Sequence, residues 1–161
     1  MKTRLIYLVL LIVCFSCGTN NKPVSDAQKE EAKIAMITLM NSYVDAIKER
    51  NADKIISHYL DSPEFMFYAD GKRQGYNELV ARVRKDFPDN VSKYDGKWDT
   101  INVSVLNPDA VTAAAQFHEV LTNKEGIETR LKGEITWIAV RVEKDWKFIY
   151  AHAFYLPDTI K

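Results

Sequence analysis

The stretch Asp145-Trp146-Lys147-Phe148-Ile149-Tyr150-Ala151-His152 is typical of a β-strand. Aromatic side chains recur in it at every second position, which is the side-chain period of a strand. That alternation predicts one shared face for His152 and the aromatic residues Trp146, Phe148, Tyr150 and Phe154. Because Lys144-Asp145 has the composition of a tight turn, we expect the strand to run from Trp146 to Leu156.

Three further strands are expected directly before this one. Apolar residues from Trp98 to Val105 suit a strand that ends at Asn107-Pro108-Asp109. The next two strands are expected over 110–121 and 129–142, with Asn123-Lys124-Glu125-Gly126 as the hairpin between them. Short turns between successive strands predict an antiparallel meander.

The first half of the domain is expected to be mostly helical. Apolar residues recur at spacings of three and four after Ser25, which with Gln28 forms a capping-box pattern. The expected elements are a long helix over 26–50, a short helix over 52–59 capped by Asn51, a strand over 65–68 turned by Asp70-Gly71, and a helix that follows Gly75 and is ended by Pro88. The resulting order α-α-β-α-β-β-β-β predicts an α+β fold, in which a curved antiparallel sheet wraps on the long helix and leaves a cone.

The N-terminal residues resemble the signal of bacterial lipoproteins. Lys2 and Arg4 precede an apolar run over 5–15, which is too short to span a bilayer as a helix. Small Ser16 then precedes Cys17, as in a lipobox, although Cys14 occupies the position where leucine is usual. The resemblance implies a signal peptide over 1–16, a lipidated Cys17, a tether up to residue 25 and a domain over 26–161.

We therefore expect a cell-envelope protein, anchored by lipid to the periplasmic or outer-surface face of a bacterial membrane. A secretory signal cut elsewhere and an uncleaved anchor are the alternatives for the same residues. Cys14 and Cys17 are the only cysteines, so cleavage before Cys17 leaves no disulfide possible.

Composition excludes several classes of function. The 161 residues suit one domain, and 22 basic residues balance 22 acidic ones, which argues against a nucleic-acid partner. The sequence has no metal-binding spacing of histidines or cysteines, no nucleophile elbow and no glycine-rich phosphate loop. We expect neither a metal nor a cofactor.

Several phrases together resemble the nuclear transport factor 2-like superfamily, in particular its SnoaL-like and ketosteroid-isomerase-like branches. They are Tyr43-Val44-Asp45-Ala46-Ile47, Asn51-Ala52-Asp53-Lys54, Tyr68-Ala69-Asp70-Gly71, Gly75, and Asp145 to His152. The resemblance covers roughly residues 26–158 and implies a cone of three N-terminal helices packed on a curved antiparallel sheet. Because this superfamily hosts isomerases, dehydratases, cyclases, binding proteins and oligomerisation modules, its fold does not decide the function.

His152 and His118 are the candidate catalytic bases. SnoaL-like relatives often carry histidine at the position of His152, and His118 shares a strand face with Gln116. His152 is equally compatible with a core or interface role, and His58 is expected at the surface or as a helix cap. Tyr43 resembles the helix tyrosine of ketosteroid isomerases or is a core aromatic; the acid expected on their first strand is missing here.

We expect six residues to line the interior of the cone, and an error of one strand position would place any strand residue on the opposite face. They are Tyr43, Phe67, Gln116, His118, Thr136 and His152. The first functional hypothesis is binding of a small, largely apolar molecule in the cone. The alternatives are an isomerase, cyclase or dehydratase with a histidine base, and a homodimeric assembly module in which Trp98 and Trp137 face outward.

Overall fold

The computed structural model describes residues 23–157, apart from the side chains of residues 88, 89 and 157. The predicted signal peptide, Cys17 and most of the predicted tether lie outside the described residues. Within residues 23–157, no helix combines the length and apolar character needed to cross a membrane.

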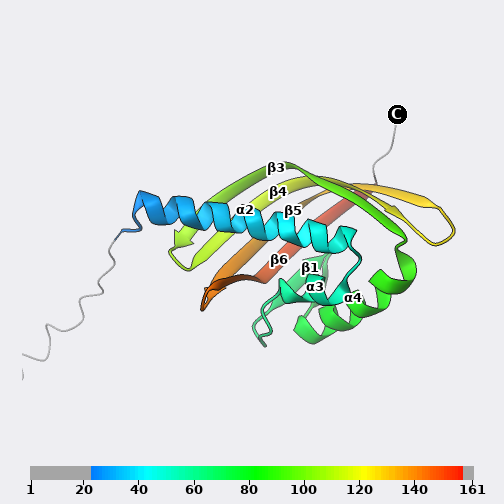
Figure 1. Cartoon of the computed structure of the whole chain (residues 1–161), viewed down its shortest axis with the longest axis horizontal. Helices are drawn as coiled ribbons and strands as arrows, with labels where there is room; N and C mark the ends of the chain where they lie inside the picture. Colours follow the sequence, from blue (N-terminus) through cyan, green and yellow to red (C-terminus); the bar gives the residue numbers. More distant parts are fainter. Residues whose placement is uncertain (1–22, 158–161) are drawn as a thin grey trace, which may run out of the picture.

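Helix α2 (Asp26–Lys48) lies across one face of a curved sheet, and α3 (Ala52–Ser57) and α4 (Tyr76–Asn90) lie near one edge of it (Figure 1). The capping box is confirmed, because the Gln28 N–H donates to Ser25 Oγ at 3.3 Å and the Ser25 N–H donates to Gln28 Oε1 at 3.0 Å. Asn51 caps α3 as expected, accepting from the Lys54 N–H at 3.0 Å. Helix α4 runs to Asn90, so the prediction that Pro88 ends it is wrong by two residues, an ordinary error at helix termini.

The sheet has six strands in the order β2-β1-β6-β5-β4-β3. The antiparallel meander is confirmed as β3 (Lys93–Asn107), β4 (Ala110–Thr122), β5 (Glu128–Val142) and β6 (Asp145–Pro157). Strand β1 (Met66–Ala69) pairs parallel with β6 and antiparallel with β2 (Lys72–Gln74). The sequence did not predict β2, because Lys72-Arg73-Gln74 has no apolar alternation.

A β-bulge in β6 determines which of its side chains face the helices. Ile138 pairs with Tyr150, and Ala139 pairs with Phe148, so Ile149 is the extra residue on β6. Phe148 and Ala151 are both buried although they are three positions apart. The bulge therefore reverses the alternation, and Tyr150 and His152 face away from the core.

The core lies between α2 and the concave face of the sheet. Small residues on β4, Ala113 and Ala115, are buried there and allow close approach of the helix. Met36 and Met40 of α2 are completely buried in the same cluster, and so is Phe148 of β6. This packing fills the cone beneath the first half of α2.

Candidate functional site

A small cavity of about 50 Å³ lies between the C-terminal half of α2 and the concave face of the sheet. Its lining comes from α2, β1 and the four meander strands. The lining residues are Tyr43, Val44, Ile47, Phe67, Tyr94, Lys97, Trp98, Phe117, Glu119, Ile135, Trp137 and Tyr155. The volume is well below the roughly 300 Å³ at which pockets for drug-sized ligands begin. A ligand larger than a few atoms therefore needs a lining side chain to move.

Two of the six predicted lining residues, Tyr43 and Phe67, border this cavity. The placement of the other four was wrong: Gln116, His118 and Thr136 are exposed on the convex face of the sheet, and so is His152. For His152 the cause is the bulge at Ile149, which reverses the alternation along β6.

On β4 the opposite alternating set of residues faces the cavity. Val111, Ala113, Ala115 and Phe117 are all buried, and continuing this set brings Glu119 inward. The sequence signal was present, because this set is more apolar than the set that contains Gln116. The same alternation on β5 buries Trp137, and the outward placement of Trp137 and Trp98 considered from the sequence is not observed.

The two histidines on the convex face do not meet. The His118 ring is hydrogen-bonded to Asp99, which lies in a bulge of β3. The His152 ring packs edge-on against Tyr68 at a centroid distance of 6.2 Å. His118 pairs with Lys132, whereas His152 pairs with Thr136, so four residues along β5, roughly 13 Å, separate their positions. The expected location of both histidines inside the cone is therefore wrong.

Glu119 is the carboxylic acid of the cavity. Burial raises its pKa from 4.5 to about 7, and a hydrogen bond from the Tyr94 hydroxyl offsets part of this effect. Gly96, the partner of Glu119 across the β3–β4 ladder, leaves room for Tyr94. A carboxyl group with a pKa near neutrality can both donate and accept a proton under ordinary conditions.

Tyr43 and Tyr155 also line the cavity, and Tyr59, which is not part of the lining, is bonded to Tyr43. The Tyr59 hydroxyl donates to the Tyr43 hydroxyl at 2.8 Å, and burial raises the pKa of both. Burial also raises the pKa of Tyr155, which packs edge-on against Phe117 at 5.5 Å. These phenols therefore remain protonated at neutral pH and act as hydrogen-bond donors.

Two indole N–H groups in the cavity lining lack a hydrogen-bond partner. Trp98 Nε1 and Trp137 Nε1 are both buried without an acceptor. A buried unpaired donor costs roughly 1–3 kcal/mol, and most native structures avoid it. Both tryptophans line the same cavity, so a bound molecule with acceptor atoms is a candidate partner for these N–H groups. Sequence reasoning missed this role because it depends on which face each tryptophan takes.

His58 lies outside this cavity, and its expected surface location was wrong. The alternative expectation, that His58 is a helix cap, is confirmed, because it caps the C-terminus of α3. Its side chain is only 8% exposed. Burial lowers the pKa of this imidazole. Among the described residues, no group of three or more His, Cys, Asp or Glu side chains could hold a metal ion.

The long helix on a curved six-stranded sheet, with a cavity between them, defines a protein of the nuclear transport factor 2-like superfamily. A model of the SnoaL-like domain matches residues 37–156, and the chain belongs to this family. Among curated proteins, none matches the sequence.

Solved structures share the fold at low sequence identity. A candidate scytalone dehydratase from Novosphingobium aromaticivorans has a TM-score of 0.74 at 11% identity and covers 85% of this chain and 94% of its own. A candidate aromatic ring hydroxylase from the same organism has a TM-score of 0.69 at 20% identity, covering 78% of this chain and 90% of its own. LinA has a TM-score of 0.68 at 14% identity and covers 82% of this chain and 92% of its own. At these identities the likeness extends to the fold alone.

Proposed function

We propose that the cone cavity binds a small, largely apolar molecule that carries hydrogen-bond acceptors. The observation that carries this proposal is that Trp98 and Trp137, whose buried indole N–H groups both lack a partner, line the same cavity. Aromatic rings would surround the apolar part of the ligand, and the two N–H groups would bind its acceptor atoms. The SnoaL-like fold supports a ligand-binding or isomerase-type domain in general.

Ligand entry would require a side chain to move, because the present cavity is only about 50 Å³. Tyr94 is the side chain best placed to do so. It lies on β3, it is only partly buried, and it rests over Gly96. Rotation of Tyr94 away from Gly96 would enlarge the cavity without a change in the backbone.

The test is mass spectrometry of the whole chain under native and then denaturing conditions. A discrete added mass that disappears on denaturation supports the proposal and identifies the molecule. A purified chain that carries no added mass, and binds no member of a library of small aromatic carbonyl compounds, would contradict it. We also propose that the chain is a homodimer, although Trp98 and Trp137, which were considered for its contact, line the cavity instead. The native mass tests this proposal.

A second candidate function is acid–base catalysis in the same cavity. The observation in its favour is Glu119, a carboxyl group with a pKa near 7 beside the Tyr94 hydroxyl. It could move a proton in an isomerisation or dehydration, the role that sequence reasoning gave to a histidine. Once the ligand is known, Glu119→Gln should abolish turnover and leave ligand affinity nearly unchanged. Equal loss of both would indicate binding alone.

Anchoring by lipid on Cys17 is also part of the proposed function. The support is the lipobox-like sequence that precedes Cys17. Expression in a bacterial host with a radiolabelled fatty acid should label the native chain and not the Cys17→Ser variant. Equal labelling of the two would exclude Cys17 as the acceptor.

A further inference from the structure

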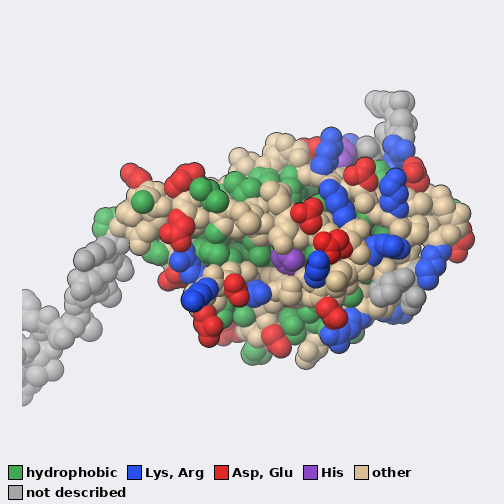
Figure 2. Space-filling view, in the orientation of Figure 1, with side chains coloured by type: hydrophobic (Ala, Val, Ile, Leu, Met, Phe, Trp, Pro, Cys, Tyr) green, Lys and Arg blue, Asp and Glu red, His purple; other side chains and the backbone are tan. Residues whose placement is uncertain are grey.

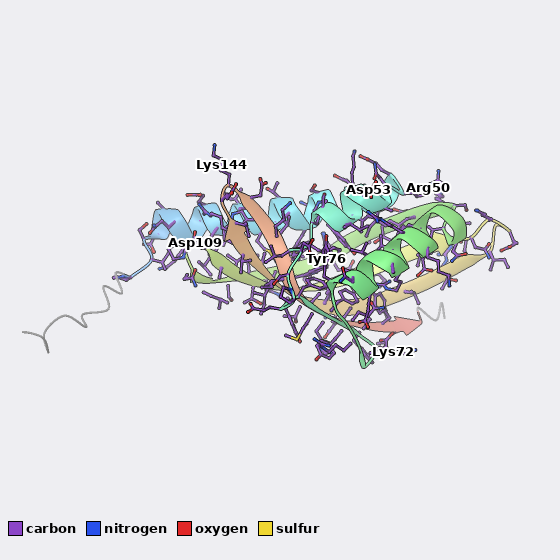
Figure 3. All side chains as sticks on the ribbon, turned by 90° about the horizontal axis from the view of Figure 1, so that it is seen from below. Arg50, Asp53, Lys72, Tyr76, Asp109 and Lys144 are labelled. Carbon is purple, nitrogen blue, oxygen red and sulfur yellow. The ribbon has the colours of Figure 1, made fainter. Side chains whose placement is uncertain are left out.

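A larger groove lies on the side of α2 away from the cone cavity. Its volume is about 680 Å³, and its walls are α2, α3 and the turn between β5 and β6. Figure 3 shows Lys144 in that turn, beside α2, and Figure 2 shows acidic and basic side chains interspersed over the exposed face of the protein. The volume falls within the range of pockets that bind small molecules.

A serine and a histidine are hydrogen-bonded to each other in this groove. Ser42 Oγ lies 2.9 Å from His58 Nε2. Ser42 is exposed on α2, whereas the His58 side chain is 8% exposed. The hydroxyl group is therefore accessible from the groove, and the imidazole lies behind it.

The other ring nitrogen determines the tautomer of His58. Nδ1 lies 2.7 Å from the Lys54 carbonyl oxygen, which can only accept a hydrogen bond. Nδ1 therefore carries the proton, and in the neutral ring Nε2 has a free electron pair. It follows that Ser42 Oγ–H donates to Nε2, which is the arrangement in which a histidine removes the proton of a serine.

The backbone that carries the imidazole is bonded to β6. The His58 carbonyl accepts from the Phe148 N–H at 2.8 Å, and the Leu60 N–H donates to the Phe148 carbonyl at 2.8 Å. These bonds fix the end of α3 to β6. Burial lowers the pKa of His58, so the ring is neutral and able to accept a proton at pH 7. Lys147 lines the same groove, and its positive charge also lowers the pKa of His58.

We propose that Ser42 and His58 form a nucleophile–base pair that hydrolyses small carboxylic esters bound in this groove. Ser42 Oγ forms a bond to the ester carbonyl carbon, and its proton passes to His58 Nε2. The bond to the leaving oxygen then breaks as that oxygen takes the proton from Nε2. Water attacks the acyl-serine in the same way and releases the acid and free Ser42. Lys147, whose ammonium donates to the Ser57 carbonyl at 2.7 Å, adds positive charge to the groove in which the oxyanion forms.

The proposal is tested with a fluorophosphonate, which transfers its phosphonyl group to an activated serine and releases fluoride. The whole chain is treated with the probe and digested, and the labelled peptide is identified by mass spectrometry. We expect one adduct on Ser42, no such adduct in Ser42→Ala, and labelling at least 100-fold slower in His58→Asn. Hydrolysis of 4-nitrophenyl acetate should fall in parallel.

Ser57→Ala is the matched control. Ser57 lines the same groove, but its hydroxyl donates to the Lys54 carbonyl at 2.7 Å instead of to a histidine. This variant should keep the Ser42 adduct. Because Ser42 is exposed, Ser42→Ala should fold even if His58→Asn does not. A wild-type chain without an adduct on Ser42, or one labelled equally on Ser42 and Ser57, would overturn the proposal and leave the Ser42–His58 bond a structural contact only.

Discussion

The Tyr94 side chain lies directly over Gly96, two residues farther along β3. A β-carbon built on Gly96 would lie 2.1 Å from the Tyr94 hydroxyl oxygen and 2.4 Å from its Cζ atom. Gly96 is also the cross-strand partner of Glu119. The absence of a side chain at one position thus brings a phenol and a carboxyl group together in the cavity wall.

Gly96→Ala should therefore displace the Tyr94 ring and weaken its interaction with Glu119. We expect a loss of about 1–3 kcal/mol in the free energy of unfolding, which is typical of overpacking. Urea denaturation measures this value. The control is the same substitution in a Tyr94→Ala background, where the clash is absent and the loss should be much smaller. Equal losses in both backgrounds would show that the two residues do not interact.

Glu119 should make the protein less stable as pH rises from 4.5 to about 7. In this window the unfolded chain ionises at 4.5, whereas the native carboxyl keeps its proton up to about 7. The native state then binds more protons, so the free energy of unfolding falls with increasing pH, by at most about 3 kcal/mol. The decrease should level off above pH 7.

The matched variant for this measurement is Glu119→Gln, which keeps the shape of the side chain and does not titrate. Urea denaturation of both proteins between pH 4.5 and 8 isolates the contribution of Glu119 from that of other groups. His58 acts in the opposite direction, because its lowered pKa causes a loss of stability as pH falls below 6.5. If the difference in the free energy of unfolding between wild type and Glu119→Gln is the same at every pH in this range, the prediction is contradicted.

Trp137→Phe should separate ligand recognition from packing. The substitution keeps an aromatic ring and removes an N–H group that has no partner in the ligand-free protein. We expect affinity for the cone ligand to fall about tenfold, as for the loss of one hydrogen bond. Calorimetric titration with the molecule found by mass spectrometry measures this. His152→Ala, on the convex face, should bind the ligand as tightly as the wild type does. A greater loss of affinity in His152→Ala than in Trp137→Phe would show that the ligand binds on the convex face.

Arg141 of β5 links the first half of α2 to the sheet through side-chain interactions. It forms ion pairs with Glu31 at 3.1 Å and Asp109 at 3.5 Å, and its guanidinium lies 5.0 Å from the ring centroid of Trp146. Arg141→Lys keeps the charge but loses the planar group. It should lower the free energy of unfolding by about 1 kcal/mol. Hydrogen exchange should increase in the first turns of α2.

Arg130→Lys is the comparison for that substitution. Arg130 pairs with Glu128 at 3.1 Å, and both side chains are about half exposed. Such surface pairs contribute little to stability, so the free energy of unfolding should fall by less than about 0.5 kcal/mol. If both substitutions have the same effect, Arg141 does not hold the helix.

The sequence was most informative where periodicity and turn chemistry agree. The capping residues Ser25 and Asn51 begin their helices as expected, and the four meander strands lie where alternation and turns placed them. Local patterns suffice there because each element satisfies its own hydrogen bonds or pairs with its neighbour in sequence.

The candidate site was harder to predict because it depends on the face that each strand presents. One extra residue, Ile149, turned His152 outward, and no local pattern marks that bulge. Strand β3 begins at Lys93, earlier than its apolar residues indicated, so Tyr94 and Gly96 were not expected in the sheet. The Ser42–His58 pair joins two helices, and helical periodicity alone does not specify which residues of two helices meet.

The parallel pairing of β1 with β6 sets the order in which the fold can assemble. The Tyr155 N–H donates to Asp70 Oδ1 at 3.1 Å across 85 residues, whereas the hairpins of the meander join neighbouring segments. Contacts between distant segments form late, because the chain between them must first be ordered. During synthesis, β1 and β2 emerge long before the strand that completes their edge of the sheet. The growing chain therefore carries Phe67 without its final packing partners until β6 has been made.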